Sequence, residues 1–346
     1  MATILPSLTH TRTNGASGIP AWGLMLGAAA VGFALTSRRP RYDFENKVVL
    51  ITGGSRGLGL VLARQLAGRG ALIGLLARDA LELARARRTI PSQSLVQLLP
   101  GDVTQPSQVE RAVKTLVQRF GRIDVVINNA GQILSAPFDD TTDADFKALL
   151  DVHLWGTLHV TRATLPFLER EGGRIINICS IGGRIPVPHL SAYCASKFAQ
   201  VGLSEVMAEE LRAKGIRVTT ILPGLMRTGS HRHAWFKGHH AGEYGMFSLI
   251  GGLPITSMGA ERAARLILRA AARGDAEAII PFAVRQIAKA ASMLPNTAIG
   301  VMAAANRVLP GPGSKFPMQG RQVGLRPAVA AAVTLSERAA QRNNEV

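Results

Sequence analysis

Three side chains have the types and the spacing to move a proton to or from an oxygen atom. Tyr193 and Lys197 are four residues apart, so in a helix they lie on one face. A phenol with a pKa near ~10 exchanges its proton poorly at neutral pH unless a neighbouring cation stabilises the phenolate, and Lys197 could supply that cation. Ser180 follows an apolar run and could hydrogen-bond a substrate oxygen. Because a Tyr-x-x-x-Lys spacing also occurs on ordinary helices, the interpretation depends on the surrounding sequence.

A glycine-rich turn earlier in the chain predicts a binding site for a pyrophosphate. Residues 52–59 read TGGSRGLG and follow the apolar run Lys47–Thr52. Glycines let the backbone turn sharply and approach a pyrophosphate, which then lies at the positive end of the following helix. Taken alone, the turn is also compatible with a tight connection in any α/β protein.

Strand and helix patterns alternate from Asn46 onward. Near-continuous apolar runs predict buried strands at Lys47–Thr52, Ala71–Leu76, Ile123–Asn128, Arg174–Cys179 and Val218–Leu222. Helical patterns fill 105–120, 142–171 and 191–214. Buried strands separated by helices indicate a parallel sheet that is covered on both faces. The predicted fold class is therefore α/β with a doubly wound parallel sheet.

Further motifs resemble those of the short-chain dehydrogenase/reductase superfamily. The spacing T-G-x-x-x-G-x-G of the turn is similar to the superfamily's, and matching segments follow in the same order at Asp102-Val103, Asn128–Gly131, Ser180, Tyr193–Lys197 and Pro223–Thr228. Together they span about residues 46–281. The resemblance implies a Rossmann-type fold, a nicotinamide cofactor and catalysis at a carbonyl or secondary alcohol. It implies that Tyr193 is the acid/base, that Ser180 orients the substrate, and that Lys197 also binds the nicotinamide ribose.

The resemblance assigns roles to particular positions. The catalytic candidates are Ser180, Tyr193, Lys197 and His153. The candidates for contact with the cofactor are Gly53, Ser55, Arg56, Gly57, Leu58, Gly59, Arg78, Asp102, Val103, Asn129, Ala130, Gly131, Tyr193, Lys197, Pro223, Gly224 and Thr228. Among these, Asp102 and Val103 would contact the adenine, and Asn129 would lie along the cofactor.

At one position the chain departs from the superfamily's pattern. The superfamily usually has an asparagine that helps to hold a water molecule between the lysine and solvent, and His153 stands at that place. Imidazole also hydrogen-bonds water and titrates near neutrality, so His153 could serve the same proton relay. The alternative is a neutral histidine packed in the core.

The residues after the second predicted strand favour NADP(H) over NAD(H). A site for NAD usually has an acidic residue there, which binds the ribose 2′-hydroxyl, whereas a 2′-phosphate needs a cation. Here the strand is followed by Ala77 and Arg78, and Arg56 could flank the same phosphate with a second guanidinium. The alternatives are that Arg78 only caps a surface turn beside Asp79, and that the enzyme uses NAD.

Composition excludes several other classes of protein. The chain has 346 residues, of which 47% are hydrophobic, and a formal net charge of +17. It is too apolar to be mainly disordered, and its cysteines, Cys179 and Cys194, are too few for a disulfide-built scaffold. The positive charge fits anionic lipid, nucleic acid or a phosphorylated ligand. We expect no nucleic acid, since no patch interleaves aromatic and basic residues.

The N-terminal residues predict a membrane anchor. Ile19–Leu35 is uncharged and is followed by Arg38, Arg39 and Arg41. A spanning helix needs ~20 apolar residues and ~17 at the least, so this segment is borderline. The basic flank would hold the rest of the chain on the cytosolic side. A cleaved signal peptide, with Ala28–Ala30 as its cleavage site, and a mitochondrial presequence are the alternatives.

The C-terminal part adds a basic extension to the superfamily's core. In Phe282–Leu294 apolar residues recur at helical spacing, with Arg285 and Lys289 on another face. Such a helix suits anionic lipid, the protein's own surface or a dimer partner. Residues 310–327 are typical of a mobile basic linker.

Four histidines gather in the segment where the superfamily has its variable substrate lid. They are His231, His233, His239 and His240. No carboxylate or cysteine stands at a suitable spacing beside them, so we expect no metal site.

The sequence thus predicts three regions, an anchor over 1–41, an NADP-binding catalytic domain over 42–281 and the extension over 282–346. The expected substrate is an apolar carbonyl or alcohol of the steroid, retinoid or acyl-chain kind, with Pro186–Pro188, Leu225 and Met226 lining its pocket. We expect a homodimer or homotetramer. A non-catalytic protein that only binds the cofactor is the alternative from another class.

Overall fold

The computed structural model describes residues 41–324, 329 and 333–345. The chain divides into the units Met1–Arg41 and Tyr42–Val346. The predicted anchor over 19–35 lies outside the described residues. Within the described ranges, no helix has both the length and the apolar character needed to cross a membrane.

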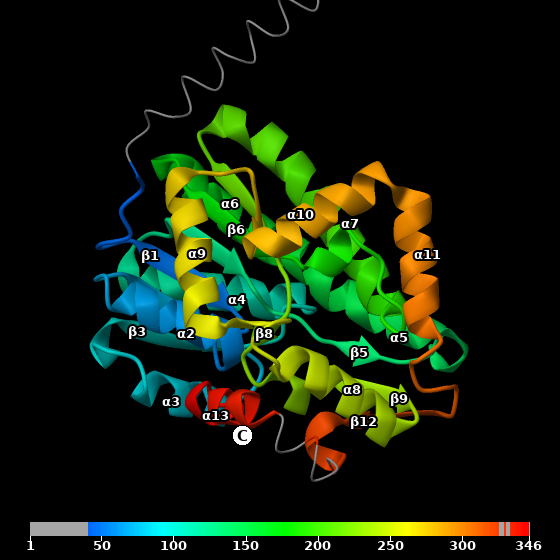
Figure 1. Ribbon diagram of the computed structural model, residues 1–346. Coiled ribbons are helices and arrows are strands. Elements are labelled where there is room, and N and C mark those ends of the chain that lie inside the picture. The colour runs from blue at the N-terminus through cyan, green and yellow to red at the C-terminus, as the bar shows by residue number, and fades with distance from the viewer. Residues whose placement is uncertain (1–40, 325–328, 330–332, 346) are drawn as a thin grey trace, which may run out of the picture. The chain divides into compact units, whose positions relative to one another are not determined.

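A seven-stranded parallel sheet forms the centre of the described unit (Figure 1). From one edge to the other its strands are β3 (Val96–Pro100), β2 (Leu72–Ala77), β1 (Val48–Thr52), β4 (Val125–Asn128), β6 (Arg174–Ile178), β7 (Arg217–Pro223) and β11 (Glu277–Ile280). Strand order reverses between β1 and β4, as in a doubly wound Rossmann-type sheet. The predicted fold class is confirmed.

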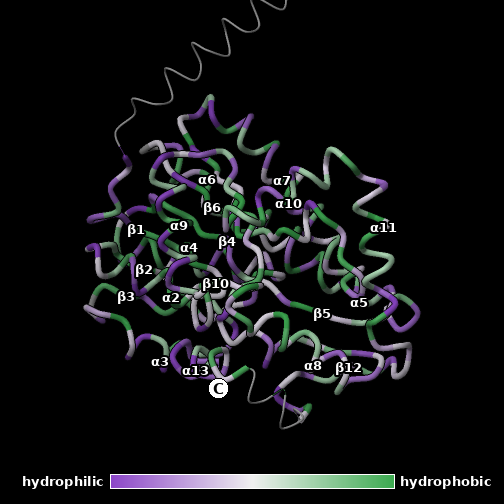
Figure 2. The backbone as a smooth tube through the Cα atoms, in the orientation of Figure 1, coloured by the Kyte–Doolittle hydropathy of each residue, from purple (hydrophilic) through white to green (hydrophobic). Residues whose placement is uncertain are grey.

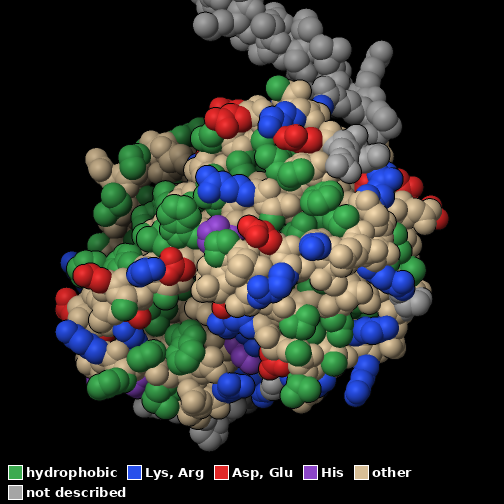
Figure 3. Space-filling view, turned by 180° about the vertical axis from the view of Figure 1, so that it is seen from behind, with side chains coloured by type: hydrophobic (Ala, Val, Ile, Leu, Met, Phe, Trp, Pro, Cys, Tyr) green, Lys and Arg blue, Asp and Glu red, His purple; other side chains and the backbone are tan. Residues whose placement is uncertain are grey.

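The central strands are buried on both faces because alternate side chains enter two separate cores. Val49 and Ile51 of β1 belong to one apolar cluster, whereas Val48 and Leu50 belong to the other. Hydropathy along the chain shows the same pattern, with apolar residues concentrated in the strands (Figure 2). Charged side chains of both signs are spread over the outer surface (Figure 3).

Helices cover both faces of the sheet. The cluster around Val49 is closed by α2 (Gly57–Ala67), α3 (Ala80–Arg88) and α9 (Ala260–Arg273). The opposite face is covered by α4 (Pro106–Phe120), α6 (Gly156–Glu171) and α7 (Ser191–Glu210), and α5 (Asp143–Leu150) lies against α7. A five-residue π-helical turn, Asp151–Trp155, joins α5 to α6.

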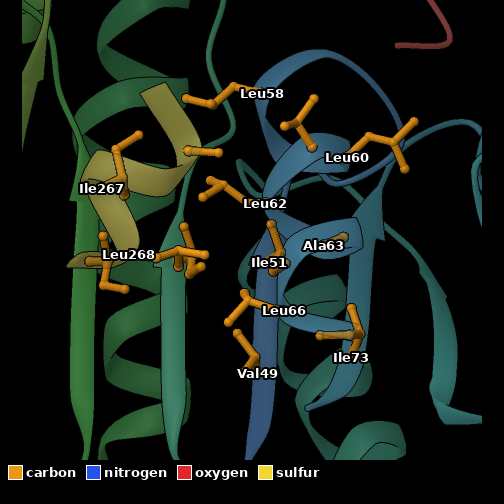
Figure 4. Packing of buried hydrophobic residues seen from close by; sticks show 14 of the residues in the cluster. Val49, Ile51, Leu58, Leu60, Leu62, Ala63, Leu66, Ile73, Ile267 and Leu268 are labelled. Carbon is orange, nitrogen blue, oxygen red and sulfur yellow. The ribbon is translucent and has the colours of Figure 1, made fainter. Parts of the chain in front are cut away.

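Packing between α2 and α9 holds the glycine-rich turn in place at the end of β1. Figure 4 shows Leu62 and Leu66 of α2, Ile267 of α9, and Val49 and Ile51 of β1 in one buried apolar cluster. All of these side chains are fully buried. Burial of each side chain contributes roughly 1.5–3 kcal/mol to the stability of the fold. This packing fixes α2, and with it the glycine-rich turn, against β1.

The five strands predicted from apolar runs agree with the observed ones to within about two residues at each end, and Glu277–Pro281, which resembles the superfamily's last strand, contains β11, but β3 was not predicted. Only Val96 and Leu99 of its five residues are buried, since it is the edge strand beside β2. A run that is half exposed lacks the continuous apolar pattern by which the other strands are recognised.

A smaller layer lies beyond the carboxyl ends of the strands. It contains the three-stranded sheet of β5 (Leu134–Ser135), β9 (Trp235–Gly238) and β12 (Ser314–Gln319), the pair β8 (Met226–Arg227) and β10 (Met258–Gly259), and the helix α8 (His240–Gly252). The C-terminal extension adds α10 (Phe282–Met293), α11 (Pro295–Asn306) and α13 (Thr334–Arg342).

The expectation of a mobile linker over 310–327 is wrong for Ser314–Gln319. These residues form β12, which pairs antiparallel with β9. Met318 packs against the cluster that contains Phe236 and Tyr244. An open edge of β9 and an apolar contact thus order a segment whose glycines and prolines suggest a linker.

Candidate active site

One cavity of about 810 Å³ collects nearly all the predicted site residues. It lies at the carboxyl ends of the parallel strands, where doubly wound sheets bind their ligands. Its lining includes Gly53, Ser55, Arg56, Gly57, Leu58, Arg78, Asp102, Val103, Asn129, Ala130, Gly131, His153, Ser180, Tyr193, Lys197, Pro223, Gly224 and Thr228. Gly59 is the one predicted residue outside this lining. A Cβ there would stand 2.3 Å from the Gly53 carbonyl oxygen, so Gly59 serves the close packing of α2 against the turn.

The glycine-rich turn has the geometry of a phosphate cradle. Gly53 has φ +62°, and a Cβ on it would stand 3.0 Å from the Ala130 Cα. The Asn129 side-chain amide donates to the carbonyl oxygens of Thr52 (2.9 Å) and Gly53 (3.1 Å), which fixes the turn against the end of β4. These residues fit a dinucleotide, because the start of α2, where backbone N–H groups can bind a phosphate, lines the cavity.

Residues 343–345 lie on this turn, which the sequence did not predict. The Gly57 N–H donates to the Asn343 carbonyl oxygen (2.9 Å). The Asn344 side-chain amide donates to the carbonyl oxygens of Ser55 (2.9 Å) and Glu82 (3.1 Å). Glu345 Oε1 is 2.6 Å from where a Cβ of Gly57 would be. The segment after α13 therefore occupies part of the space at the phosphate end of the cavity.

Arg56 and Arg78 differ from each other in their surroundings. Arg56 faces the carboxylate of Glu82 (3.1 Å) and the carboxyl group of Glu345 (3.5 Å), whose pKa burial raises to about 8. Arg78 is exposed, lines the cavity and has no ion pair with any residue in the described part of the chain. Of the two predicted phosphate ligands, Arg78 is the one whose guanidinium is available, whereas Arg56 would first have to leave its acidic partners.

Tyr193 is placed by α7 and lies half-buried in the lining of the cavity. Burial raises the pKa of its phenol to about 12, and a hydrogen bond with Ser180 lowers this pKa in part. Ser180 lies at the end of β6 and accepts a hydrogen bond from the Gly182 N–H (3.0 Å), which fixes its hydroxyl. At neutral pH the phenol is thus protonated and can donate its proton.

Lys197 is buried on the same face of α7. Its Nζ donates to the Ile178 carbonyl oxygen (3.1 Å) and to Gln200 Oε1 (2.8 Å), and it lies 5.9 Å from the centroid of the Tyr193 ring. Burial lowers the pKa of Lys197 to about 8. The lowering of the Tyr193 pKa by Lys197 stays a prediction, because burial of the phenol is the larger effect and raises this pKa overall.

A chain of buried hydrogen bonds continues from Lys197 to the π-helical turn. Gln200 Nε2 donates to Thr157 Oγ1 (2.9 Å), and the Thr157 hydroxyl donates to the His153 carbonyl oxygen (2.7 Å). Gln200 is fully buried, and the oxygen and the nitrogen of its side-chain amide each have a hydrogen-bond partner. These direct hydrogen bonds hold the ammonium of Lys197 in one position.

The His153 side chain has protein partners at both ring nitrogens. Nε2 accepts from the Gln132 N–H (3.1 Å), so the proton is on Nδ1, which donates to Ser196 Oγ (2.8 Å). Burial, and second the charge of Lys197, hold the pKa of His153 well below its usual value. With both nitrogens occupied, the geometry favours the packing alternative over the water relay. His153 stands edge-on to Tyr193, with ring centroids 5.6 Å apart, and positions it.

The other end of the cavity is apolar. Its lining there consists of Ile133, Ile185, Val187, Leu190, Leu225, Met226, Phe247, Val284, Ile287 and Met302. Val187, Leu225 and Met226 were expected in this role, whereas Pro186 and Pro188 do not line the cavity. One cavity therefore has a glycine-rich end with both arginines and acidic side chains, a phenol in the middle, and an apolar end.

The histidines of the lid segment pair with residues from the C-terminal extension. His231 Nε2 is 2.8 Å from Glu337 Oε1, and His240 Nε2 is 2.7 Å from the Phe316 carbonyl oxygen. Burial and the neighbouring arginines lower the pKa of His233 to about 4. Over the described ranges, no three His, Cys, Asp or Glu side chains come together in a way that could hold a metal ion.

Sequence reasoning missed two groups of residues at this site. Gln200 could have been noticed as an amide three residues after Lys197 on one helix face. Asn343–Glu345 carry no local signal, because their place on the turn depends on how the whole extension folds back.

Comparison with known proteins gives a family match for the region that builds this site. Residues 47–236 match the family model described as short chain dehydrogenase. A solved short-chain dehydrogenase from Streptomyces avermitilis superposes with a TM-score of 0.65 at 26% identity, covering 75% of this chain and 97% of that one.

Curated relatives are similar over the same region. Oxidoreductase BOA17 of Botryotinia fuckeliana is 40% identical over 183 residues, which is 53% of this chain and 66% of that protein. The 11-beta-hydroxysteroid dehydrogenase-like 3 of Arabidopsis thaliana is 36% identical over 197 residues, 55% of this chain and 63% of that protein. Both matches span just under two thirds of the relative's length.

Proposed function

The chain belongs to the short-chain dehydrogenase family, and from that membership we propose that it is an NADP(H)-dependent oxidoreductase that interconverts a carbonyl and a secondary alcohol on an apolar substrate. Oxidoreductases of this family use a nicotinamide cofactor, NAD or NADP. The observation that carries the proposal is that one cavity is lined by the phosphate-binding turn and by Ser180, Tyr193 and Lys197.

The proposed mechanism assigns the proton to Tyr193. NADPH, when bound, supplies the hydride that reduces the carbonyl carbon. Ser180 hydrogen-bonds the carbonyl oxygen and orients it, and the Tyr193 hydroxyl gives its proton to that oxygen as the alcohol forms. The raised pKa of Tyr193 keeps the proton on the phenol at neutral pH, which suits the reductive direction.

Lys197 would act through its charge and its remaining donor. An ammonium has three N–H donors, and two are used by Ile178 and Gln200. The third is available for the nicotinamide ribose. With a pKa of about 8, Lys197 is charged at neutral pH and stabilises the phenolate that is left after proton transfer.

Arg78 supports the preference for NADP(H). Its guanidinium lines the cavity beside Ala77, at the end of β2, where a 2′-phosphate needs a cation. The second candidate is an NAD-dependent alcohol dehydrogenase, favoured by Glu82, whose carboxylate also lines this part of the cavity. In that case Glu82 would accept from the ribose hydroxyl in place of its present donors, Ser55 and Arg56.

The apolar end of the cavity supports a steroid-, retinoid- or acyl-chain-like substrate. The name of the Arabidopsis relative, a hydroxysteroid dehydrogenase-like protein, agrees with this class. We also propose that residues 19–35 anchor the enzyme in a membrane with the catalytic domain facing the cytosol, because the basic cluster follows the apolar segment. A homodimer or homotetramer is part of the same proposal.

The experiment is to screen apolar ketones for ketone-dependent oxidation of NADPH and NADH, with the full chain in detergent. We expect turnover with at least one ketone and NADPH, and much less with NADH. Equal or better turnover with NADH would support the second candidate. Tight NADPH binding without turnover of any ketone or alcohol would support a protein that only binds the cofactor.

A further inference from the structure

No residue of the helix α11 is buried by the part of the chain that the structure describes. Its segment Pro295–Asn306, PNTAIGVMAAAN, nevertheless contains no charged side chain. A helix of about 12 residues is marginal in water by itself, and a helix that is apolar on all sides is usually found inside a core or a membrane. Something outside the described chain is therefore expected to cover α11.

Apolar exposure continues from α11 to its neighbours. The exposed fractions are 60% for Ile299 and 59% for Val301 on α11, and 77% for Met293 and 59% for Leu294 at the turn between α10 and α11. Phe282 and Ile287 of α10 are also exposed. We define these six residues as the α10–α11 surface. Hydrophobic side chains gather around a hollow on the left of Figure 3, which is the side of α11 after the half-turn from Figure 1.

The charges around this surface have one sign. Between Glu277 and Glu337 the sequence has no acidic residue. The bases Arg285 and Lys289 are exposed on α10, and Arg307 is exposed directly after α11. Between Glu277 and Glu337, basic residues are therefore the only charged neighbours of this apolar surface. This pattern is typical of a helix that lies in the headgroup region of an anionic bilayer.

A second copy of the chain fits this surface less well. In a two-fold contact the same patch meets itself, so Arg285, Lys289 and Arg307 of one copy would approach those of the other. The segment has no carboxylate to pair with them. The same three cations are attracted by phosphatidylglycerol or phosphatidylserine, each by ~1 kcal/mol near the membrane.

We infer that the α10–α11 surface inserts into the headgroup region of an anionic membrane, as a contact separate from the proposed anchor over 19–35. Ile287, which belongs to this surface, also lines the active-site cavity. Val284 of α10 and Met302 of α11 line the cavity beside it. The inserted surface thus borders the apolar end of the cavity. If the substrate is apolar, as the proposed function has it, the substrate enters the cavity from the bilayer. This route of entry rests on the proposed function, whereas the membrane insertion does not.

Site-directed labelling tests the insertion independently of activity. The full chain with Ile299→Cys is labelled with an environment-sensitive fluorophore and reconstituted into vesicles of phosphatidylcholine with phosphatidylglycerol. Cys179 and Cys194 are buried and burial raises the pKa of both thiols, so they react slowly, and the labelled parent serves as a blank. The control is Arg88→Cys on α3, which is exposed beside the opposite edge of the sheet.

We expect a blue shift of the label at position 299 and strong quenching by lipids with a spin label on the acyl chain, with neither at position 88. Replacing Arg285 and Lys289 by glutamine should reduce the quenching, and so should vesicles of phosphatidylcholine alone. An unshifted, unquenched label at 299 would overturn the inference. A blue shift without quenching by the lipids would also overturn it, and would indicate a protein partner. Neither result depends on turnover, so the proposed function stands or fails separately.

Discussion

The carbonyl oxygen of Asn343 accepts a 2.9 Å hydrogen bond from the N–H of Gly57, at the start of the helix that follows the phosphate-binding turn. The side chain of Glu345 lies against the same glycine. Backbone N–H groups at this helix start are the ones that a pyrophosphate needs. We therefore expect residues 343–345 to compete with a dinucleotide for this helix start.

Loosening the segment should strengthen cofactor binding. Asn344→Ala removes two buried hydrogen bonds and puts alanine at φ 59°, which alanine adopts reluctantly. We expect NADPH to bind roughly tenfold more tightly, the factor that ~1.4 kcal/mol gives. Isothermal titration calorimetry measures this. Arg338→Ala, on the exposed face of α13, is the control and should bind like the parent. Equal affinities of all three proteins would show that the segment does not compete.

Glu345 should make the competition depend on pH. Burial raises the pKa of its carboxyl from 4.5 to about 8 when the segment lies on the turn. The docked segment therefore holds a proton that the released one has lost, so docking weakens as pH rises from about 5 to about 8. NADPH should bind more tightly over that interval. Glu345→Gln, with a neutral amide at every pH, should lose this dependence. If NADPH affinity depended on pH in the same way in Glu345→Gln, a group other than Glu345 would be responsible for that dependence.

Arg78 should decide between the two cofactors. Arg78→Asp replaces the exposed cation that directly follows β2 by a charge that repels a phosphate. We expect the affinity for NADPH to fall by roughly tenfold or more, with a much smaller loss for NADH. Arg88→Asp on α3 makes the same change of net charge outside the cavity and should leave both affinities intact. Equal losses for NADPH and NADH in Arg78→Asp would place the 2′-phosphate away from Arg78.

Gln200 should set the alkaline limit of activity through Lys197. The pKa of Lys197 is lowered to about 8, so kcat/KM should decline above about pH 8 as the ammonium loses its charge. Gln200→Leu removes an acceptor of the charged form and should move this limb to lower pH. Gln200→Glu adds an anion and should move it to higher pH. If kcat/KM declined at the same alkaline pH in all three proteins, Gln200 would have no influence on the pKa of Lys197.

His153 should affect the stability of the fold and the placement of Tyr193. It should not cause a loss of activity at acid pH. Because its pKa lies well below the usual value, we expect no loss of activity near pH ~6.5 that His153→Asn would abolish. His153→Leu leaves the Gln132 N–H and the Ser196 hydroxyl without their partner, so unfolding should become easier by roughly 1–3 kcal/mol. Denaturant titrations and pH profiles test this. An acid limb that disappears in His153→Asn would restore the relay interpretation.

The fold and the centre of the site could be predicted because their signals are local. Continuous apolar runs mark strands such as β1 and β4, and the spacing of Tyr193 and Lys197 places both on one helix face. Residues around the turn follow from the same logic, since the glycines stand where the backbone must turn sharply.

Features that depend on distant contacts could not be predicted. Arg56 looks like a phosphate ligand in the sequence, but Glu82 and Glu345 reach it only in the folded chain. The partners of His153 come from Gln132 and Ser196, on two other segments. For β12, the pairing edge is provided by β9, and no pattern within 310–327 reveals it.

Turnover of Tyr193→Phe tests the proposed oxidoreductase mechanism most directly. Phenylalanine keeps the ring that stands beside His153 and removes only the hydroxyl that donates the proton. With a ketone that the parent reduces, single-turnover oxidation of bound NADPH should slow by ~10²–10⁴-fold, while calorimetry shows unchanged NADPH affinity. A variant that retains more than about a tenth of the parent's rate would contradict Tyr193 as the proton donor, since loss of such a donor costs at least ~10²-fold.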